Sequence, residues 1–169
     1  MVNILDQNKE LSGLRREEFE EKIVQVNRVS KKTQGGNKIG FSVLTVVGDG
    51  AGRVGVGLGK APDISSAIRK GVTLAKKHLV EVPIVEGTIP FSYNIKLGAA
   101  KVLLKPAPPG SGVIAGGAVR SVVSAAGIKN ISSKMLGTGN KASNVYATIE
   151  ALKKISERYE NEKRLKEEK

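Results

Sequence analysis

The sequence contains no cysteine and no tryptophan, and only three phenylalanines and three tyrosines. The absence of cysteine excludes disulfide bonds, thiolate metal sites and thiol catalysis. Because aromatic residues are scarce, we expect a core of small aliphatic side chains, and binding of single strands by base stacking is disfavoured. No apolar run approaches the ~18 residues of a membrane span, and the acidic beginning is unlike a signal peptide. We therefore expect a cytoplasmic protein or one of an organelle stroma.

Positive charge is abundant and unevenly distributed. The net charge is +12, and residues 23–78 carry ten Lys or Arg against two Asp or Glu. A basic surplus within one segment is the electrostatic footprint of a polyanionic partner. The alternative, in which lysine only keeps the protein soluble, is disfavoured because the surplus is so concentrated.

The apolar pattern predicts two domains of the α+β class. We expect a flexible tail at residues 1–14, and the acidic stretch at residues 15–22 favours a short helix. The first domain, residues 15–82, is predicted to hold three strands and then a helix, at Ile23–Val29, Phe41–Val47, Arg53–Gly59 and from Pro62 onward. Between the first two strands, the polar segment Ser30–Lys38 indicates a loop with a Gly-Gly pivot.

The second domain is predicted to span residues 83–156, after a boundary marked by Pro83 and Gly87. Strands are expected at Thr88–Lys96, Lys101–Lys105 and Ile128–Met135. A helix over Ala118–Ala126 should end at Gly127, a good left-handed C-cap. A last helix over Asn144–Tyr159 should fray into a charged tail at residues 157–169.

Two glycine-containing motifs resemble nucleotide-binding motifs of enzymes, but the residues around them do not fit such a site. Gly50–Gly55 matches the G-x-G-x-x-G dinucleotide fingerprint, but a strand follows it where a helix is required. Gly59-Lys60 lacks the earlier glycine and the following Ser or Thr of a phosphate-binding loop. His78 is the only histidine, and we expect it to lie partly buried at the edge of the core. We therefore predict no catalytic residue, no metal and no cofactor.

The remaining signal is positive charge beside flexible backbone. Cations occur beside the Ser30–Lys38 loop, at both ends of a glycine-bearing strand and on the first helix. Such cations are typical of phosphate contacts. The glycines of that strand would let an RNA backbone come close. The predicted RNA-binding residues are Arg28, Ser30, Lys31, Lys32, Gly35, Gly36, Lys38, Arg53, Lys60, Arg69 and Lys70. We expect structured, duplex-rich RNA read by shape, and a loop that becomes ordered only against RNA.

Two long motifs resemble a known family. Val26–Lys31, Gly35-Gly36 and Leu44–Gly55 are similar to the first signature of the bacterial-type small-subunit ribosomal protein five family. Gly112–Arg120 resembles its second signature. The resemblance spans about residues 20–156.

The resemblance implies a fold, partners and a function. The first domain would be similar to double-stranded-RNA-binding domains, with a three-stranded antiparallel sheet and a helix. The second would be a two-layer β-β-β-α-β-α domain with a left-handed crossover. Family members are structural components of the small ribosomal subunit, bind its RNA where body meets head, and support translational accuracy. Their partners are small-subunit proteins four and eight, and the resemblance places the contact with protein four at Gly112, Gly116, Gly117 and Arg120.

Two other classes remain open on the residues alone. An enzyme that uses the glycine-rich turn would have to bind a nucleotide. An architectural DNA-binding protein would use the same positive charge but prefer B-form DNA to folded RNA.

Overall fold

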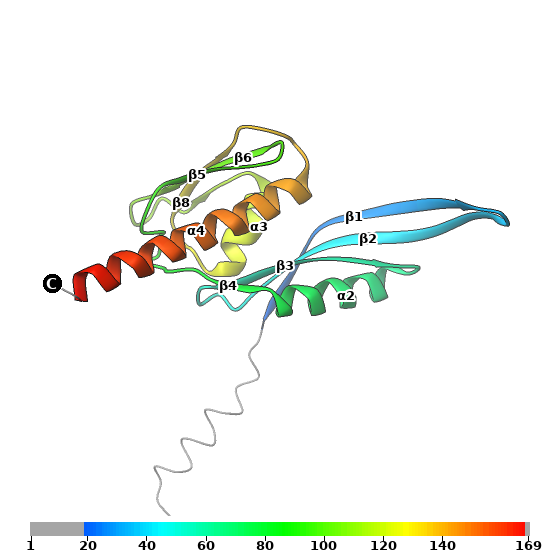
Figure 1. Ribbon diagram of the computed structural model, residues 1–169, viewed down its shortest axis with the longest axis horizontal. Coiled ribbons are helices and arrows are strands. Elements are labelled where there is room, and N and C mark those ends of the chain that lie inside the picture. Colours follow the sequence, from blue (N-terminus) through cyan, green and yellow to red (C-terminus); the bar gives the residue numbers. More distant parts are fainter. Residues whose placement is uncertain (1–18, 168–169) are drawn as a thin grey trace, which may run out of the picture.

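The computed structural model describes residues 19–167, which form two four-stranded sheets and three helices. Figure 1 shows the two sheets with helices between them, and a long two-stranded ribbon projecting from the first. The strand order is β1-β2-β3-β4 in one sheet and β5-β6-β8-β7 in the other. The predicted α+β class is confirmed.

The first sheet is antiparallel and has one strand more than predicted. It contains β1 (Glu20–Thr33), β2 (Gly36–Gly48), β3 (Arg53–Ala61) and the short β4 (Leu79–Glu81). Helix α2 (Ile64–Lys77) packs on one face of β2 and β3. It begins at Asp63, whose carboxylate accepts a hydrogen bond from the backbone N–H of Ser66 at 2.8 Å and so satisfies a free donor of the first turn.

The segment predicted to be a loop is part of the ribbon, so that prediction is wrong. Strands β1 and β2 pair from Glu20 opposite Gly48 to Thr33 opposite Gly36, joined by a turn at Gln34 and Gly35. Glu20–Lys22 is likewise strand rather than the expected helix. The predicted tail at residues 1–14 and the stretch 15–18 lie outside the described residues.

The glycines of β3 face α2. A Cβ at Gly55, Gly57 or Gly59 would collide with the helix backbone, at the carbonyl oxygens of Ala75, Gly71 and Ala67 respectively. Three alternate residues without side chains therefore let the helix lie directly on the strand. The expectation that these glycines admit an RNA backbone is wrong, because α2 already occupies that face.

The second sheet has the element order β-β-β-α-β-α that the resemblance implies. Its strands are β5 (Tyr93–Leu97), β6 (Ala100–Pro106), β7 (Val113–Ile114) and β8 (Ile131–Met135), with β7 parallel to β8 and the other pairs antiparallel. Helix α3 (Gly117–Ala126) ends at Gly127, whose φ of 83° confirms the predicted left-handed cap. Strand β5 begins at Tyr93, later than the predicted Thr88.

Helix α4 (Lys141–Glu167) does not fray at residue 156 but continues to the end of the described chain. Ion pairs along the helix join Lys154 to Glu157 at 2.9 Å and Arg158 to Glu162 at 3.1 Å. The guanidinium of Arg158 also lies 4.5 Å from the ring centroid of Phe91. These contacts hold the charged end of the helix in place where the sequence predicted a tail. No helix among residues 19–167 is long and apolar enough to cross a membrane.

One hydrophobic core joins the two sheets. The face of the first sheet opposite α2 contributes Leu44, Val46, Val54 and Val56, and these side chains cluster with residues of α3, α4 and β6, among them Val119, Val122, Leu152 and Leu104. Helices α3 and α4 lie between the sheets in Figure 1, so each sheet buries apolar surface against the same pair of helices.

Candidate nucleic-acid interface

The pairing of β1 with β2 determines which way the ribbon cations face. Lys31 lies opposite Lys38, and Ser42, four residues further along β2, lies opposite Lys60 of β3. Because alternate residues of a strand share a face, Lys31, Lys38 and Lys60 lie on one face. A hollow of about 360 Å³ is lined by these three lysines together with Val29 and Ile39.

The other predicted ribbon residues lie on the opposite face. Arg28, Ser30 and Lys32 pair with Phe41, Ile39 and Asn37, which alternate with Lys38 and Gly40 along β2. Gly35 and Gly36 form the tip, where Gly36 has a φ of 122°, a conformation that favours glycine. The ribbon therefore carries cations on both faces.

Lys60 connects the ribbon to α2. A second hollow, of about 400 Å³, is lined by Lys60, Arg69 and Lys70 together with Leu58 and Leu74. We call Lys31, Lys38, Lys60, Arg69 and Lys70 the ribbon–helix surface. All five side chains are exposed, and among residues 19–167 none forms a salt bridge. Their charge is therefore available to an external anion.

Arg53 is not part of this surface, because it begins β3 while Lys60 lies near the other end, about 23 Å away at 3.3 Å per residue. Its Nε donates to the Asp49 carboxylate at 2.7 Å, and its guanidinium lies 5.6 Å from the Phe19 ring centroid. The backbone N–H groups of Ala51 and Arg53 donate to the other Asp49 oxygen, at 2.8 and 3.0 Å. Partial burial acts to raise the pKa of Asp49, but the hydrogen bonds from Arg53 and from the two N–H groups outweigh it and lower that pKa. Arg53 thus has a structural partner within its own turn.

The turn that matches the dinucleotide fingerprint holds the end of a helix. The N–H groups of Gly50 and Gly52 donate to the carbonyl oxygens of Ala125 and Ala126 at the end of α3, at 3.1 and 2.9 Å. A helix leaves its last carbonyl groups without partners, and the turn supplies donors for them from the other sheet. Gly50 and Gly52 have φ values of 67° and 109°, which favour glycine, and a Cβ at the preceding Gly48, the last residue of β2, would collide with the carbonyl of Ala125.

The residues predicted to face another protein divide into two kinds. Gly112 and Gly116 have internal roles: Gly112 has a φ of 69° and its N–H donates to Asn130 Oδ1 at 3.1 Å, while a Cβ at Gly116 would strike the side chain of Met135. Gly117 has open space beside it. Arg120 is exposed, with one contact of 3.4 Å from its guanidinium to the carbonyl of Val113. Gly112 also has open space beside it, so Gly112, Gly117 and Arg120 are accessible to a partner, whereas Gly116 packs against Met135.

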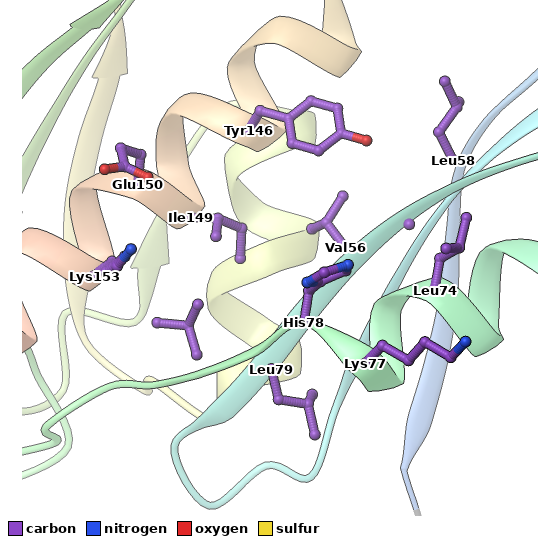
Figure 2. A pocket seen from close by; sticks show the side chains of 12 residues that line it. Val56, Leu58, Leu74, Lys77, His78, Leu79, Tyr146, Ile149, Glu150 and Lys153 are labelled. Carbon is purple, nitrogen blue, oxygen red and sulfur yellow. The ribbon is translucent and has the colours of Figure 1, made fainter.

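A hollow of about 630 Å³ lies between α4 and the end of α2. Figure 2 shows Tyr146 and Ile149 on the side of α4 that faces the end of α2, where His78 lies, and Glu150 also lines the hollow. His78 is exposed rather than partly buried as expected. Partial burial raises the pKa of Tyr146, but among the described residues His78 has no hydrogen bond to Tyr146 or Glu150. No group of three or more metal-ligating side chains occurs in residues 19–167.

Sequence reasoning missed the apolar part of the ribbon surface. Val29 and Ile39 are 44% and 43% exposed and line the hollow beside Lys31 and Lys38. The signal was present in the alternation Ile39-Gly40-Phe41-Ser42-Val43, which is typical of a strand and begins before the predicted strand does.

The two sheets, the three helices and the cation-rich ribbon define an α+β protein of the nucleic-acid-binding class. Residues 19–83 match the family model of the ribosomal protein S5 N-terminal domain, and residues 95–164 match that of its C-terminal domain. The small ribosomal subunit protein uS5 of Chloroflexus aurantiacus is 50% identical over 143 residues, which cover 85% of this chain and 80% of the relative. The protein of the same name from Thermotoga maritima is 50% identical over 139 residues, 82% of this chain and 78% of the relative. The chain belongs to the ribosomal protein S5 family. Membership of this family confirms that the protein is not an enzyme.

Proposed function

We propose that this chain is a structural component of the small ribosomal subunit and binds small-subunit ribosomal RNA through its ribbon–helix surface. The observation that carries the proposal is the position of Lys60, which lines both hollows. Lys60 therefore connects the ribbon lysines to the cations of α2, and the five exposed cations form one continuous surface. The cations would contact phosphates and fix the position of the protein without reading bases.

The shape of the ribbon favours folded RNA. A two-stranded ribbon with cations on both faces can lie between two RNA segments, with Lys31 and Lys38 toward one and Arg28 and Lys32 toward the other. None of these side chains is a ring that could stack on an unpaired base. Recognition would therefore depend on the spacing of phosphates in structured RNA, such as the junction of body and head that the resemblance implies.

Contacts with neighbouring proteins form the second part of the proposal. We expect Gly117 and Arg120 to face protein four, because they are the two members of the predicted interface that are exposed. Arg120 can bind a carboxylate through two parallel hydrogen bonds. Protein eight as a neighbour, the support of translational accuracy and the ribosomal location follow from the same resemblance.

The RNA-binding part is tested by the salt dependence of binding. Neutralising five phosphates should make log K fall by about 3.5 to 4.5 units per tenfold rise in salt, at about 0.7–0.9 per contact. Removing two charges with Lys31→Gln/Lys38→Gln should reduce the slope by about 1.5. The matched control is Lys129→Gln/Lys153→Gln, which removes two exposed charges elsewhere. Equal slopes for both variants would refute the surface, and stronger competition by duplex DNA than by folded RNA would favour an architectural DNA-binding protein.

The protein contact is tested separately. Arg120→Glu should weaken binding to protein four at least tenfold while RNA affinity changes less than threefold. Arg120→Lys, which keeps the charge but loses the planar fork, should give an intermediate result. An unchanged affinity for protein four in a pull-down titration of Arg120→Glu would show that Arg120 is not at that interface.

A further inference from the structure

The second sheet has one face that carries four lysines. On β6, Lys101 and Lys105 alternate with the buried Val102 and Leu104, so the lysines point away from the core. Lys96 of β5 is paired with Lys101, and Lys134 of β8 is paired with Leu103, the residue between the two lysines of β6. Because paired residues share a face, Lys96, Lys101, Lys105 and Lys134 lie together. We call these four residues the sheet lysines.

The opposite face of this sheet is covered by helices. Val102, Leu104 and Ile131 are fully buried in the core with residues of α3 and α4, and Figure 1 shows both helices on one side of the sheet. The sheet lysines are exposed on the other side. A sheet with one solvated face normally alternates apolar and mixed polar residues, whereas here the charged residues are all of one sign.

No carboxylate in the described part of the chain forms an ion pair with these lysines. The chain has no Asp or Glu from Gly87 to Ile149, a segment that includes all four strands of this sheet. Among residues 19–167, none of the sheet lysines forms a salt bridge. Lys96 and Lys101 are directly opposite each other, an arrangement in which like charges are destabilising. An external anion would remove this repulsion.

We propose that the sheet lysines form a second phosphate-binding surface, which contacts a segment of ribosomal RNA other than the one at the ribbon–helix surface. This inference rests on the proposed function, because the same RNA supplies the phosphates. Lysine is depleted at the centre of protein–protein interfaces. Leu103, which lies between the lysines, is partly buried, and Ile114, which shares the face by pairing with Ser132, is 58% exposed but lies on the edge strand β7. Asn94 and Ser132, which share the face by pairing with Leu103 and Lys105, add polar groups but no ring for base stacking. The chemistry therefore favours an RNA backbone over an acidic protein.

The first test measures RNA binding by the full chain across a range of salt concentrations. Lys101→Gln/Lys134→Gln should lower the salt slope by about 1.5, at about 0.7–0.9 per phosphate contact. The charge-matched control Lys129→Gln/Lys153→Gln should leave it within experimental error. We call Lys101→Gln/Lys134→Gln the sheet variant. Without RNA, its melting temperature should be equal to or above that of the parent, because the repulsion between the sheet lysines is reduced and no internal contact is lost.

The outcomes separate this inference from the proposed function. If Lys31→Gln/Lys38→Gln lowers the slope and the sheet variant behaves as the control does, the second surface is refuted while the ribbon–helix surface stands. If the sheet variant alone lowers the slope, the inference holds and the proposed ribbon–helix contact fails. If all three variants match the parent, both ideas are refuted.

A second test uses the absence of cysteine in the chain. Ser132→Cys introduces a single thiol in the middle of the sheet lysines, and a tethered Fe(II)–EDTA group would generate hydroxyl radicals there. In reconstituted subunits we expect cleavage of one RNA segment, distinct from the segment cleaved from Lys153→Cys on α4. Cleavage patterns that are the same from both positions, or damage only to a neighbouring protein at position 132, would overturn the proposal.

Discussion

Gly57→Ala should destabilise the protein strongly, although it adds a single methyl group. Gly57 lies in the middle of β3, and its added Cβ would collide with the carbonyl oxygen of Gly71 and lie 2.8 Å from the backbone nitrogen of Ala75. Both atoms belong to the backbone of α2, so the helix has to move as a body by about an ångström. Overpacking in a core costs about 1–3 kcal/mol, and we expect about 3 kcal/mol here because neither contact is with a flexible side chain.

Urea unfolding followed by circular dichroism measures this loss. A loss of about 3 kcal/mol should lower the melting temperature by roughly 6–12 °C for a chain of this length. Gly35→Ala is the matched control, because its added Cβ has no neighbour within 4 Å and its φ is not positive; its stability should change by less than about 0.5 kcal/mol. If both variants were equally stable, α2 would not lie directly on β3, and the glycines would again be available for an RNA backbone.

Lys60, Asp49 and the ribbon each provide a further test. Lys60→Gln should lower the salt slope of RNA binding by about 0.7–0.9 in filter-binding titrations, and a slope equal to that of Lys153→Gln would contradict its place in the surface. The lowered pKa of Asp49 means that its contribution to stability is present above about pH 4 and is lost as pH falls through the lowered value. Asp49→Asn should therefore be less stable than the parent at pH 7, by about 1–3 kcal/mol, and the two should converge near pH 2 in chemical unfolding; a constant difference at all pH values would refute the role of the carboxylate. Beyond Phe41, which pairs with Ala61, the ribbon has only two strands, and isolated two-stranded ribbons are marginally stable. Amide hydrogen exchange should therefore be faster at Val29–Thr33 than at Ile23–Asn27, and uniform protection would show that another contact holds the ribbon.

Local signals predicted much of the second half of the fold. The end of α3 at Gly127 was predictable because a left-handed cap needs glycine, whatever surrounds it. The end of α4 was not, because residues after Ser156 are held by Arg158 above Phe91, a contact between residues far apart in the sequence. From sequence alone, a run of charged residues is interpreted as a solvated tail, because the tertiary contact that orders it cannot be seen.

The sequence predicted which residues belong to the candidate site, but it did not predict how their side chains are arranged in space. The lysines of the ribbon are apparent from the sequence, yet only the register of Lys31 with Lys38 and of Ser42 with Lys60 shows which of them share a face. The glycines of β3 were assigned to RNA because a strand sequence does not reveal which element lies on it. The sheet lysines were overlooked because they come from three strands and form no run in the sequence.

The common core of the two sheets has a consequence for synthesis of the chain. Leu44, Val46 and Val54 are buried against α3 and α4, which follow β3 by some 55 to 100 residues. At about 5–20 residues per second, the first sheet leaves the translating ribosome several seconds before its covering helices. During that interval one of its faces is apolar and exposed, so we expect the nascent first half to depend on a chaperone or on the surface of the ribosome itself. For the same reason, a fragment that stops at residue 82 should aggregate rather than fold.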